Sequence, residues 1–252
     1  MDTSALSLSV RGIQKRFRGI SVLDGVSFDL QAGTITGLIG ANGAGKSTLL
    51  NVMTGLLKAD AGEVFLRGAA IGAVPTFKRA RAGLLRTFQH PRVFPSFSVG
   101  KSIDLAGTSA KAERFYATLH SLFARTPARA PAGPTYTFQK ALLAKQDVAA
   151  SSLSYGDRKL LMLAQVLAAQ GTVFCFDELF AGLGPSVIDQ VRECIVEIAN
   201  RGNTVVFVEH NLAVVRSLAT RVIFLYQGRI YRDGPAEAVL TDPEVVRLYL
   251  GD

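Results

Sequence analysis

The sequence has only two cysteines among its 252 residues. Cys175 and Cys194 show no CxxC or other metal-ligand spacing, which argues against a disulfide framework or a zinc site. The spacing favours reduced thiols, in the core or at the surface, of a cytoplasmic protein. The sequence also lacks a long apolar run. Its longest one, residues 160–176, is broken by polar residues and a glycine, so it falls short of the roughly 20 apolar residues that a membrane span needs.

The beginning of the chain shows no signal for export. Residues 1–17 lack the basic start and the apolar segment of a signal peptide, and we expect a chain that stays in the cytoplasm. Lys and Arg number 28 against 20 Asp and Glu, a formal net charge of +8. This excess favours phosphates, anionic lipid headgroups or nucleic acid over acidic proteins, and charge alone does not choose among them.

The apolar pattern predicts one α/β domain with helices on both faces of a mainly parallel sheet. A chain of this length that is 48% hydrophobic buries one substantial core. Residues 173–176 and 204–208 are continuously apolar and each follows a helical pattern, as the buried central strands of a parallel sheet do. Further strand-like runs cover residues 6–10, 26–30, 34–39 and 84–88.

The middle of the chain has a different pattern. Between residues 89 and 159 there are helical pieces such as 110–123 and a segment rich in Pro, Ala and Gly at 126–135. Because no convincing strand signal interrupts this stretch, we predict an inserted helical lobe at 89–159 within a single domain. The α/β core is then formed by residues 1–88 and 160–252.

The end of the chain carries a turn signal and then a helical pattern. Residues 233–235, Asp-Gly-Pro, predict a turn. The last residues predict an amphipathic helix with apolar positions at Val245, Val246, Leu248 and Leu250. We find no internal repeat.

A phosphate-binding loop is the strongest motif in the sequence. Residues 40–48, GANGAGKST, match G-x-x-x-x-G-K-[ST] between an apolar strand and a helical stretch. The glycines Gly40, Gly43 and Gly45 let consecutive backbone N–H groups and the helix N-terminus face phosphate oxygens. Lys46 supplies charge to the β- and γ-phosphates, and Ser47 offers its hydroxyl to Mg²⁺. The other motif residues expected to line the nucleotide are Asn42, Ala44 and Thr48.

Two acids follow the apolar strand at 173–176. Asp177 and Glu178 stand where that strand ends and the chain turns, so adjacent carboxylates can take different roles. We assign Asp177 to the orientation of Mg²⁺ and Glu178 to an attacking water. A pair of acids at a strand end is by itself often only part of a solvated turn. Because the sequence also has a phosphate-binding loop, we favour a functional role for both acids.

The string LSYGDRK at 153–159, placed between the helical lobe and the Asp-Glu strand, resembles the signature of ABC transporter ATPases, usually LSGGQ. Ser154 is expected to cap a helix, so that its hydroxyl and the Gly156 N–H face a γ-phosphate. In that family this phosphate is bound to the loop of the opposite subunit. The resemblance extends over essentially the whole chain and implies a P-loop NTPase core, an antiparallel N-terminal β subdomain and an inserted helical lobe.

The resemblance also assigns roles to three single residues. Phe17 resembles the aromatic that stacks on adenine, although a Phe near a strand can also be an ordinary packed side chain. Gln89, in RTFQH, resembles the glutamine that touches Mg²⁺ and water. His210, after the 204–208 strand, resembles the switch histidine that contacts the γ-phosphate. The catalytic residues implied are Glu178, His210 and Gln89, and the metal contacts are Ser47, Gln89 and Asp177.

Four positions depart from the family pattern. Tyr155 and Asp157 replace the usual Gly and Gln of the signature, and Asp157 places a negative charge near a phosphate site. Tyr at this position recurs in the branched-chain amino acid importer group. Leu179 stands in place of Pro, and Gly184 stands where Asp or Asn usually follows Ala-Gly-Leu. These two changes bear on communication across a dimer.

The implied function is ATP hydrolysis, with ATP and Mg²⁺ as cofactors, in a protein peripheral on the inner face of the plasma membrane. Its implied partners are a second ABC ATPase subunit, permease subunits and a solute-binding protein outside the membrane. RTFQHPRVF and the ending DPEVVRLYLGD are similar to the branched-chain amino acid (Liv-type) importers, whose relatives also serve urea and other small polar solutes.

Three alternatives remain. The YLGD-type ending also resembles the ATPase of lipopolysaccharide export. The departures at positions 157, 179 and 184 suit a catalytically weak regulatory subunit. An ABC protein acting on nucleic acid or ribosomes would suit the basic charge, but such proteins usually carry tandem cassettes, a long coiled coil or zinc fingers, so no nucleic-acid partner is expected.

Overall fold

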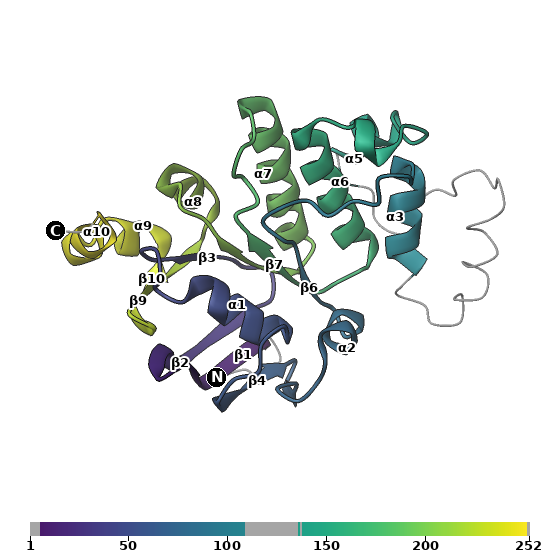
Figure 1. Ribbon diagram of the computed structural model, residues 1–252. Helices are drawn as coiled ribbons and strands as arrows, with labels where there is room; N and C mark the ends of the chain where they lie inside the picture. The colour runs from purple at the N-terminus through teal and green to yellow at the C-terminus, as the bar shows by residue number, and fades with distance from the viewer. Residues whose placement is uncertain (1–5, 109–135, 137, 251–252) are drawn as a thin grey trace.

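Two β-sheets and the helices around them make up the computed structural model, which describes residues 6–108, 136 and 138–250 (Figure 1). The smaller sheet is antiparallel, with strand order β2-β1-β4-β5. Its strands are β1 (Leu6–Phe17), β2 (Ile20–Gln31), β4 (Ala61–Leu66) and β5 (Ala69–Ala70). The antiparallel N-terminal subdomain implied by the sequence is therefore present.

The larger sheet has strand order β10-β9-β3-β8-β7-β6, and every pair in it is parallel except β10 with β9. Its strands are β3 (Ile35–Ile39), β6 (Leu84–Arg86), β7 (Val173–Asp177), β8 (Thr204–Val208), β9 (Arg221–Tyr226) and β10 (Arg229–Pro235). All residues of β3, β7 and β8 are buried. The continuous apolar runs in the sequence were thus correct indicators of central strands covered on both faces.

Two hydrophobic clusters lie on opposite faces of this sheet. Alternate residues of β3 divide between them: Ile35 and Ile39 belong to one cluster and Leu38 to the other. The first cluster is covered by α3 (Val99–Thr108), α6 (Tyr155–Ala168), α7 (Pro185–Asn200) and α8 (Leu212–Leu218). The second is covered by α1 (Lys46–Thr54) and the small sheet. Figure 1 shows α1 and α6 on the two sides of the central strands.

Shorter elements complete the described chain: α2 (Thr76–Arg81), α5 (Gln139–Leu143), the 3-10 turn η3 (Ala150–Ser152), α9 (Ala236–Leu240) and α10 (Pro243–Leu250). The predicted C-terminal helix is thus present as α10. The predicted helix at 110–123 and the segment at 126–135 lie outside the described residues, so the limits of the helical lobe stay a prediction. In the described part of the chain, no helix combines the length and the apolar character needed to cross a bilayer.

The predicted turn at 233–235 is wrong. These residues end β10, where Asp233 pairs with Ile223 and Gly234 with Val222. β10 is one of the two edge strands of the large sheet. A proline is tolerated there because an edge strand needs only part of its backbone groups for pairing, so turn-forming residue types occupy a strand.

Both cysteines are buried in the core rather than at the surface. Cys175 belongs to the cluster on the α1 side of the sheet, and Cys194 to the cluster on the other side. Burial raises the pKa of Cys175 to about 12 and also raises that of Cys194. Both side chains are therefore protonated thiols at neutral pH.

A buried arginine joins α2 to the end of α1. Arg79 is 2% exposed, and its guanidinium Nη1 donates to the carbonyl oxygens of Val52 (2.9 Å) and Met53 (2.7 Å). Its Nε donates to Val74 O (2.7 Å) and its Nη2 to Gly72 O (2.9 Å). The cation thus satisfies carbonyl groups at the C-terminus of α1, where the helix dipole favours positive charge.

We predict that Arg79→Met lowers the free energy of unfolding by about 2–4 kcal/mol, because buried carbonyl groups lose their donors. Urea denaturation followed by circular dichroism measures the change. The exposed neighbour Arg81 is the matched control, and Arg81→Met is expected to change stability by less than about 0.5 kcal/mol. Equal effects of the two substitutions would contradict this role of Arg79.

Candidate functional site

The loop between β3 and α1 has a path that only glycine can follow. A Cβ atom at Gly40 would lie 2.2 Å from the carbonyl oxygen of Leu225, and one at Gly45 would lie 2.7 Å from that of Val22. Gly45 also has φ +104°, in the region that favours glycine. The loop therefore packs closely against β9 and β2. Gly43, with φ +80°, stands at its open outer side, where an added Cβ would meet nothing within 4 Å.

The N-terminus of α1 opens onto this loop. Gly45 is the N-cap and has no side chain to satisfy the first N–H groups of the helix, and the first turn, Lys46–Leu49, carries no acidic residue. Those N–H groups and the positive end of the helix dipole are what an anion binds. Ser47 is exposed and Thr48 half-buried at the same end, beside exposed Asn42 and buried Ala44. These residues form the surroundings expected of a phosphate site.

Lys46 lies folded over the loop. Its Nζ donates to Gly40 O (2.6 Å) and Ala41 O (2.9 Å), and the side chain is buried. Burial lowers the pKa of Lys46, while the carboxylates of Glu178 and Asp177 oppose that shift. The predicted loop lysine and the two predicted acids therefore belong to one electrostatic environment.

The three predicted catalytic side chains meet. Glu178 Oε2 accepts a hydrogen bond from Gln89 Nε2 at 2.5 Å, and Glu178 Oε1 lies 3.0 Å from His210 Nε2. Glu178 follows β7, Gln89 follows β6 and His210 follows β8. Because these strands are parallel, their C-terminal ends share one edge of the sheet. Residues up to 121 positions apart in sequence, from Gln89 to His210, thus form one cluster.

The backbone at Glu178 is strained. Its φ is +47°, which a residue with a side chain adopts at a cost of about 1–2 kcal/mol. The Glu178 N–H donates to Val208 O at 3.0 Å, a bond that fixes the residue beside the end of β8. This conformation turns the chain where β7 ends and aims the carboxylate at Gln89 and His210. Strain of this kind is found where the surrounding structure enforces a functional geometry.

Asp177 has a partner that the sequence did not reveal. Arg86, at the end of β6, donates from Nη2 to Asp177 Oδ2 at 2.7 Å and from Nη1 to Asn51 Oδ1 at 2.6 Å. Both side chains of the Arg86–Asp177 pair are largely buried. The predicted metal contact of Asp177 stays a prediction, and Arg86 holds one of its two oxygens. The only available signal was the position of Arg86 at the end of a predicted strand, three residues before Gln89.

The signature segment forms the start of α6 as predicted. Ser154 is the N-cap, and its Oγ accepts from Asp157 N–H at 3.1 Å and donates to Asp157 Oδ2 at 2.8 Å. Lys145 Nζ lies 2.9 Å from the same carboxylate oxygen. Burial acts to raise the pKa of Asp157, but hydrogen bonds from Lys145 and Ser154 outweigh it, and the pKa is lowered overall. The unusual negative charge of this signature is therefore paired within the chain.

Phe17 ends β1 at the exposed tip of the β1–β2 hairpin. Its side chain is 44% exposed, and Lys15 Nζ lies 5.5 Å from the ring centroid. Val22, further along the same hairpin, is the residue that packs against Gly45 of the phosphate loop. A ring in this place fits the predicted stacking role better than a packed core role, and the assignment stays a prediction.

Tyr249 is a further residue that the sequence did not single out. Its hydroxyl on α10 donates to the carbonyl oxygen of His210 at 2.8 Å. Burial and, secondly, the carboxylate of Glu209 raise the pKa of Tyr249, so it remains a hydrogen-bond donor. The C-terminal helix is thereby attached to the segment that carries the predicted switch histidine.

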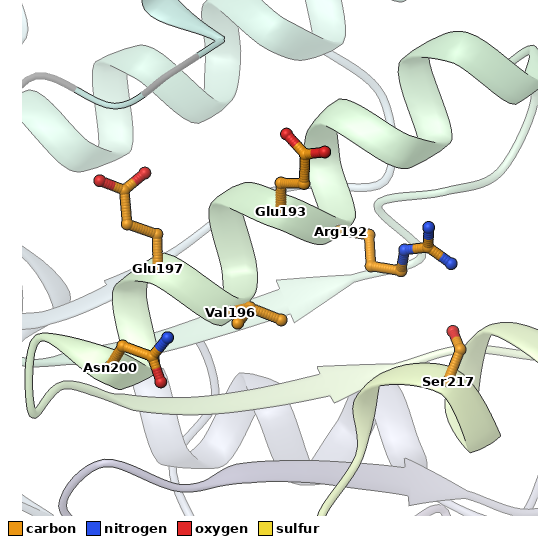
Figure 2. A pocket seen from close by; sticks show the side chains of 6 residues that line it. All are labelled: Arg192, Glu193, Val196, Glu197, Asn200 and Ser217. Atoms are coloured by element: carbon orange, nitrogen blue, oxygen red, sulfur yellow. The ribbon is translucent and has the colours of Figure 1, made fainter.

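A groove between α7 and α8 lies apart from these residues (Figure 2). It has a volume of about 440 Å³; five of its lining side chains come from α7, and Ser217 comes from α8. None of the residues predicted for nucleotide binding lines it. The groove is therefore not the candidate site, which is an open edge of the sheet.

Comparison with known proteins identifies the family of this chain. Residues 23–181 match a family profile described as ABC transporter. The high-affinity branched-chain amino acid transport ATP-binding protein LivG of Salmonella typhimurium is 33% identical over 97% of this chain and 98% of that protein. BraF of Pseudomonas aeruginosa, described in the same words, is 29% identical over the same shares. A crystal structure of an ABC transporter ATP-binding cassette in its ADP conformation has a TM-score of 0.83 and 29% identity, covering 98% and 99% of the two chains.

The strain at Glu178 gives a prediction about stability. Glu178→Ala and Glu178→Gly both remove the carboxylate, but only glycine adopts φ +47° without a steric cost. We expect the glycine variant to be more stable than the alanine variant by about 1 kcal/mol, measured by urea denaturation. In unstrained strand or helix positions the order is reversed. An alanine variant at least as stable as the glycine variant would therefore show that the position is unstrained.

Proposed function

Because the chain belongs to the ABC transporter family of ATP-binding proteins, we propose that it powers the import of a small solute. Membership of the family makes the chain an ATPase whose turnover is coupled to transport. The proposed cargo is a branched-chain or other amino acid, or a related small polar compound such as urea or an amide. The observation that carries the catalytic part is the meeting of Gln89, Glu178 and His210 beside Lys46.

In the proposed mechanism, one group of residues binds the nucleotide and Glu178 acts on the attacking water. The phosphate loop and the N-terminus of α1 hold the β- and γ-phosphates, and Lys46 leaves its carbonyl partners to meet them. Phe17 stacks on the adenine. Glu178 orients the attacking water and takes its proton. Gln89 and His210 each occupy one acceptor position on a different oxygen of Glu178, and a carboxylate has further lone pairs that can accept a hydrogen bond from the water.

The donor set also fits Mg²⁺. Ser47 offers an exposed hydroxyl, Gln89 an amide oxygen, and Asp177 the carboxylate oxygen that Arg86 does not hold. Oxygen ligands of this kind suit a small hard cation. When bound, the ion would neutralise charge on the transferred phosphoryl group.

The position of the signature supports a dimer. Ser154 and Gly156 start α6 on one face of the large sheet, whereas the phosphate loop leads into α1 on the other. Because the two helices pack on opposite faces of the sheet, we propose that their N-termini bind different phosphates and that Ser154 faces the nucleotide of a second ABC ATPase subunit. Two ATP molecules would then be sandwiched between head-to-tail subunits, and hydrolysis would release the interface.

The remaining partners are a membrane permease and a solute-binding protein. Phe88 and Phe94, on either side of Gln89 in the sequence, are exposed aromatic side chains, and Arg92 lies 4.9 Å from the Phe88 ring. We propose that this surface contacts the permease on the inner face of the plasma membrane, so that the permease senses the state of Gln89. A solute-binding protein would deliver the cargo from outside.

The identity of the neighbouring genes separates importer from exporter. Genes for permeases and a solute receptor beside this one would support import. A gene for a lipopolysaccharide-export permease in their place would exclude it. The catalytically weak alternative is favoured by Gly184, which caps α7 without a side chain. It would be excluded by ATPase turnover of the unmodified protein at the ordinary rate of roughly 1 s⁻¹ or more.

Substitution of the catalytic carboxylate tests the proposed function. Glu178→Gln keeps the size of the side chain but cannot take a proton, so we expect retained ATP binding, a stable ATP-bound dimer and a loss of turnover of at least about 100-fold. Phosphate release and size-exclusion chromatography with ATP measure these. Lys46→Ala is the contrast, since it should lose nucleotide affinity itself. Ordinary turnover in Glu178→Gln would remove Glu178 from its role.

The charge pair at the signature gives a second test. Lys145→Met leaves the Asp157 carboxylate uncompensated near the proposed γ-phosphate contact. We expect ATP-driven dimerisation in the Glu178→Gln background to weaken about fivefold, equivalent to ~1 kcal/mol of like-charge repulsion. Replacing Asp157 by Gln as well should restore it. A double variant as weak as Lys145→Met alone would show that charge compensation is not the reason for the pair.

A further inference from the structure

Lys159 is a cation enclosed in the protein core. Its side chain is 0% exposed and is among the largest fully buried ones. Lys159 adjoins Leu160 and lies one turn before Leu163, on the face of α6 that packs into the main hydrophobic cluster. Burial lowers the pKa of Lys159, opposed by the carboxylates of Glu209 and Glu178. A buried ammonium is costly unless hydrogen bonds satisfy it, so its partners explain its presence.

Those partners are the backbone of the catalytic segment. Lys159 Nζ donates to Glu178 O at 2.9 Å and to Leu179 O at 3.2 Å. It also lies 5.8 Å from the centroid of the Tyr155 ring. Tyr155 in turn packs over the same segment, because a Cβ atom at Gly182 would lie 3.1 Å from the Tyr155 ring. The start of α6 thus contacts residues 178–182 through both Tyr155 and Lys159.

Two backbone N–H groups of this segment are held by the end of β8 and by the residue that follows it. Glu178 N–H donates to Val208 O at 3.0 Å, and Phe180 N–H donates to Glu209 Oε1 at 2.9 Å. Glu209 is itself buried, and burial raises its pKa. Lys159 therefore completes a set of bonds that keeps Glu178 at its strained φ of +47°. Of the three residues that bond to this backbone, Val208, Glu209 and Lys159, only Lys159 belongs to the signature helix α6.

The start of the same helix carries the signature contacts. Lys159 follows Ser154 by five positions, a separation of roughly 7.5 Å along a helix with a rise of 1.5 Å per residue. Ser154 is the N-cap and Gly156 lies in the first turn. Lys159 therefore links the helix that carries Ser154 and Gly156 to the carbonyl groups of Glu178 and Leu179.

We propose that Lys159 is a positioning residue that couples the two nucleotide sites of the dimer. It makes the backbone of Glu178, which serves the ATP of its own subunit, follow the position of the signature helix, which faces the ATP of the other. This inference rests on the proposed function. It assigns Lys159 a task in setting the catalytic rate and none in holding nucleotide, since its hydrogen bonds go to Glu178 and Leu179.

The test replaces Lys159 by Met, which keeps the buried stem but removes the donors. We expect Lys159→Met to bind ATP within twofold of the wild-type affinity and to lose roughly 10- to 100-fold in kcat, because Glu178 is misplaced. Lys159→Arg, which restores a cation with donors, should recover most of kcat. Lys140→Met, at an exposed lysine of α5, is the matched control and should behave as wild type. If Lys159→Met does not fold, Lys159→Gln replaces it.

Amide hydrogen exchange supplies a readout that needs no dimer. In Lys159→Met, residues 178–182 should exchange roughly tenfold faster than in wild type, while the peptide covering α1 is unchanged. Wild-type kcat and exchange in the Met variant would overturn the proposal, as would loss of ATP affinity in parallel with kcat or a failure of Lys159→Arg to recover. If Glu178→Gln formed no ATP-bound dimer, the proposed function would fail. The exchange measurement would still test whether Lys159 holds residues 178–182 in place, because it needs no dimer.

Discussion

Burial of β3, β7 and β8 on both faces is the constraint on which the site depends. Apart from Thr36, Thr204 and the terminal Asp177, the side chains of these strands are apolar, so the charged groups of the site lie where the strands end. The register that pairs Asp177 with Val208 brings the following residues, Glu178 and His210, to within hydrogen-bond distance. The packing of the core therefore fixes the geometry of the cluster. A one-residue shift in the register between β7 and β8 would move Glu178 away from His210.

Features encoded within a few neighbouring residues were predicted well. The phosphate loop, the central strands and the helix cap at Ser154 each depend on adjacent residue types, and the structure has all of them. Interactions between distant segments were not predicted. Arg86 is 91 positions from Asp177, and Lys159 is 19 positions from Glu178, so no local pattern marks either pair.

The wrong turn at 233–235 has a related cause. Gly and Pro report local backbone preference, but whether a strand lies at the edge of a sheet is decided by the whole topology. The lysine at position 159 did leave a sequence signal, since it stands on the apolar face of a helix. A charged residue in such a place is a sign of a buried partner, which only the fold identifies.

The basic excess of the chain also has a different meaning after the fold is known. Lys46, Arg79 and Lys159 are all buried, and each one donates to backbone carbonyl groups. Their charges organise the phosphate loop, the end of its helix and the catalytic turn from inside. Part of the positive charge counted in the sequence is therefore buried and bonded to the backbone, and it does not contribute to a surface that partners could bind.

The state of the two cysteines has a practical consequence for studies of motion in this protein. Because both thiols are buried and held protonated, maleimide and other thiolate-directed reagents should leave them untouched in the folded chain. A cysteine introduced at the surface would then be the sole labelling point without removal of the native ones. Fluorescent or spin probes can thus be attached to the signature helix and the phosphate loop in an otherwise natural sequence.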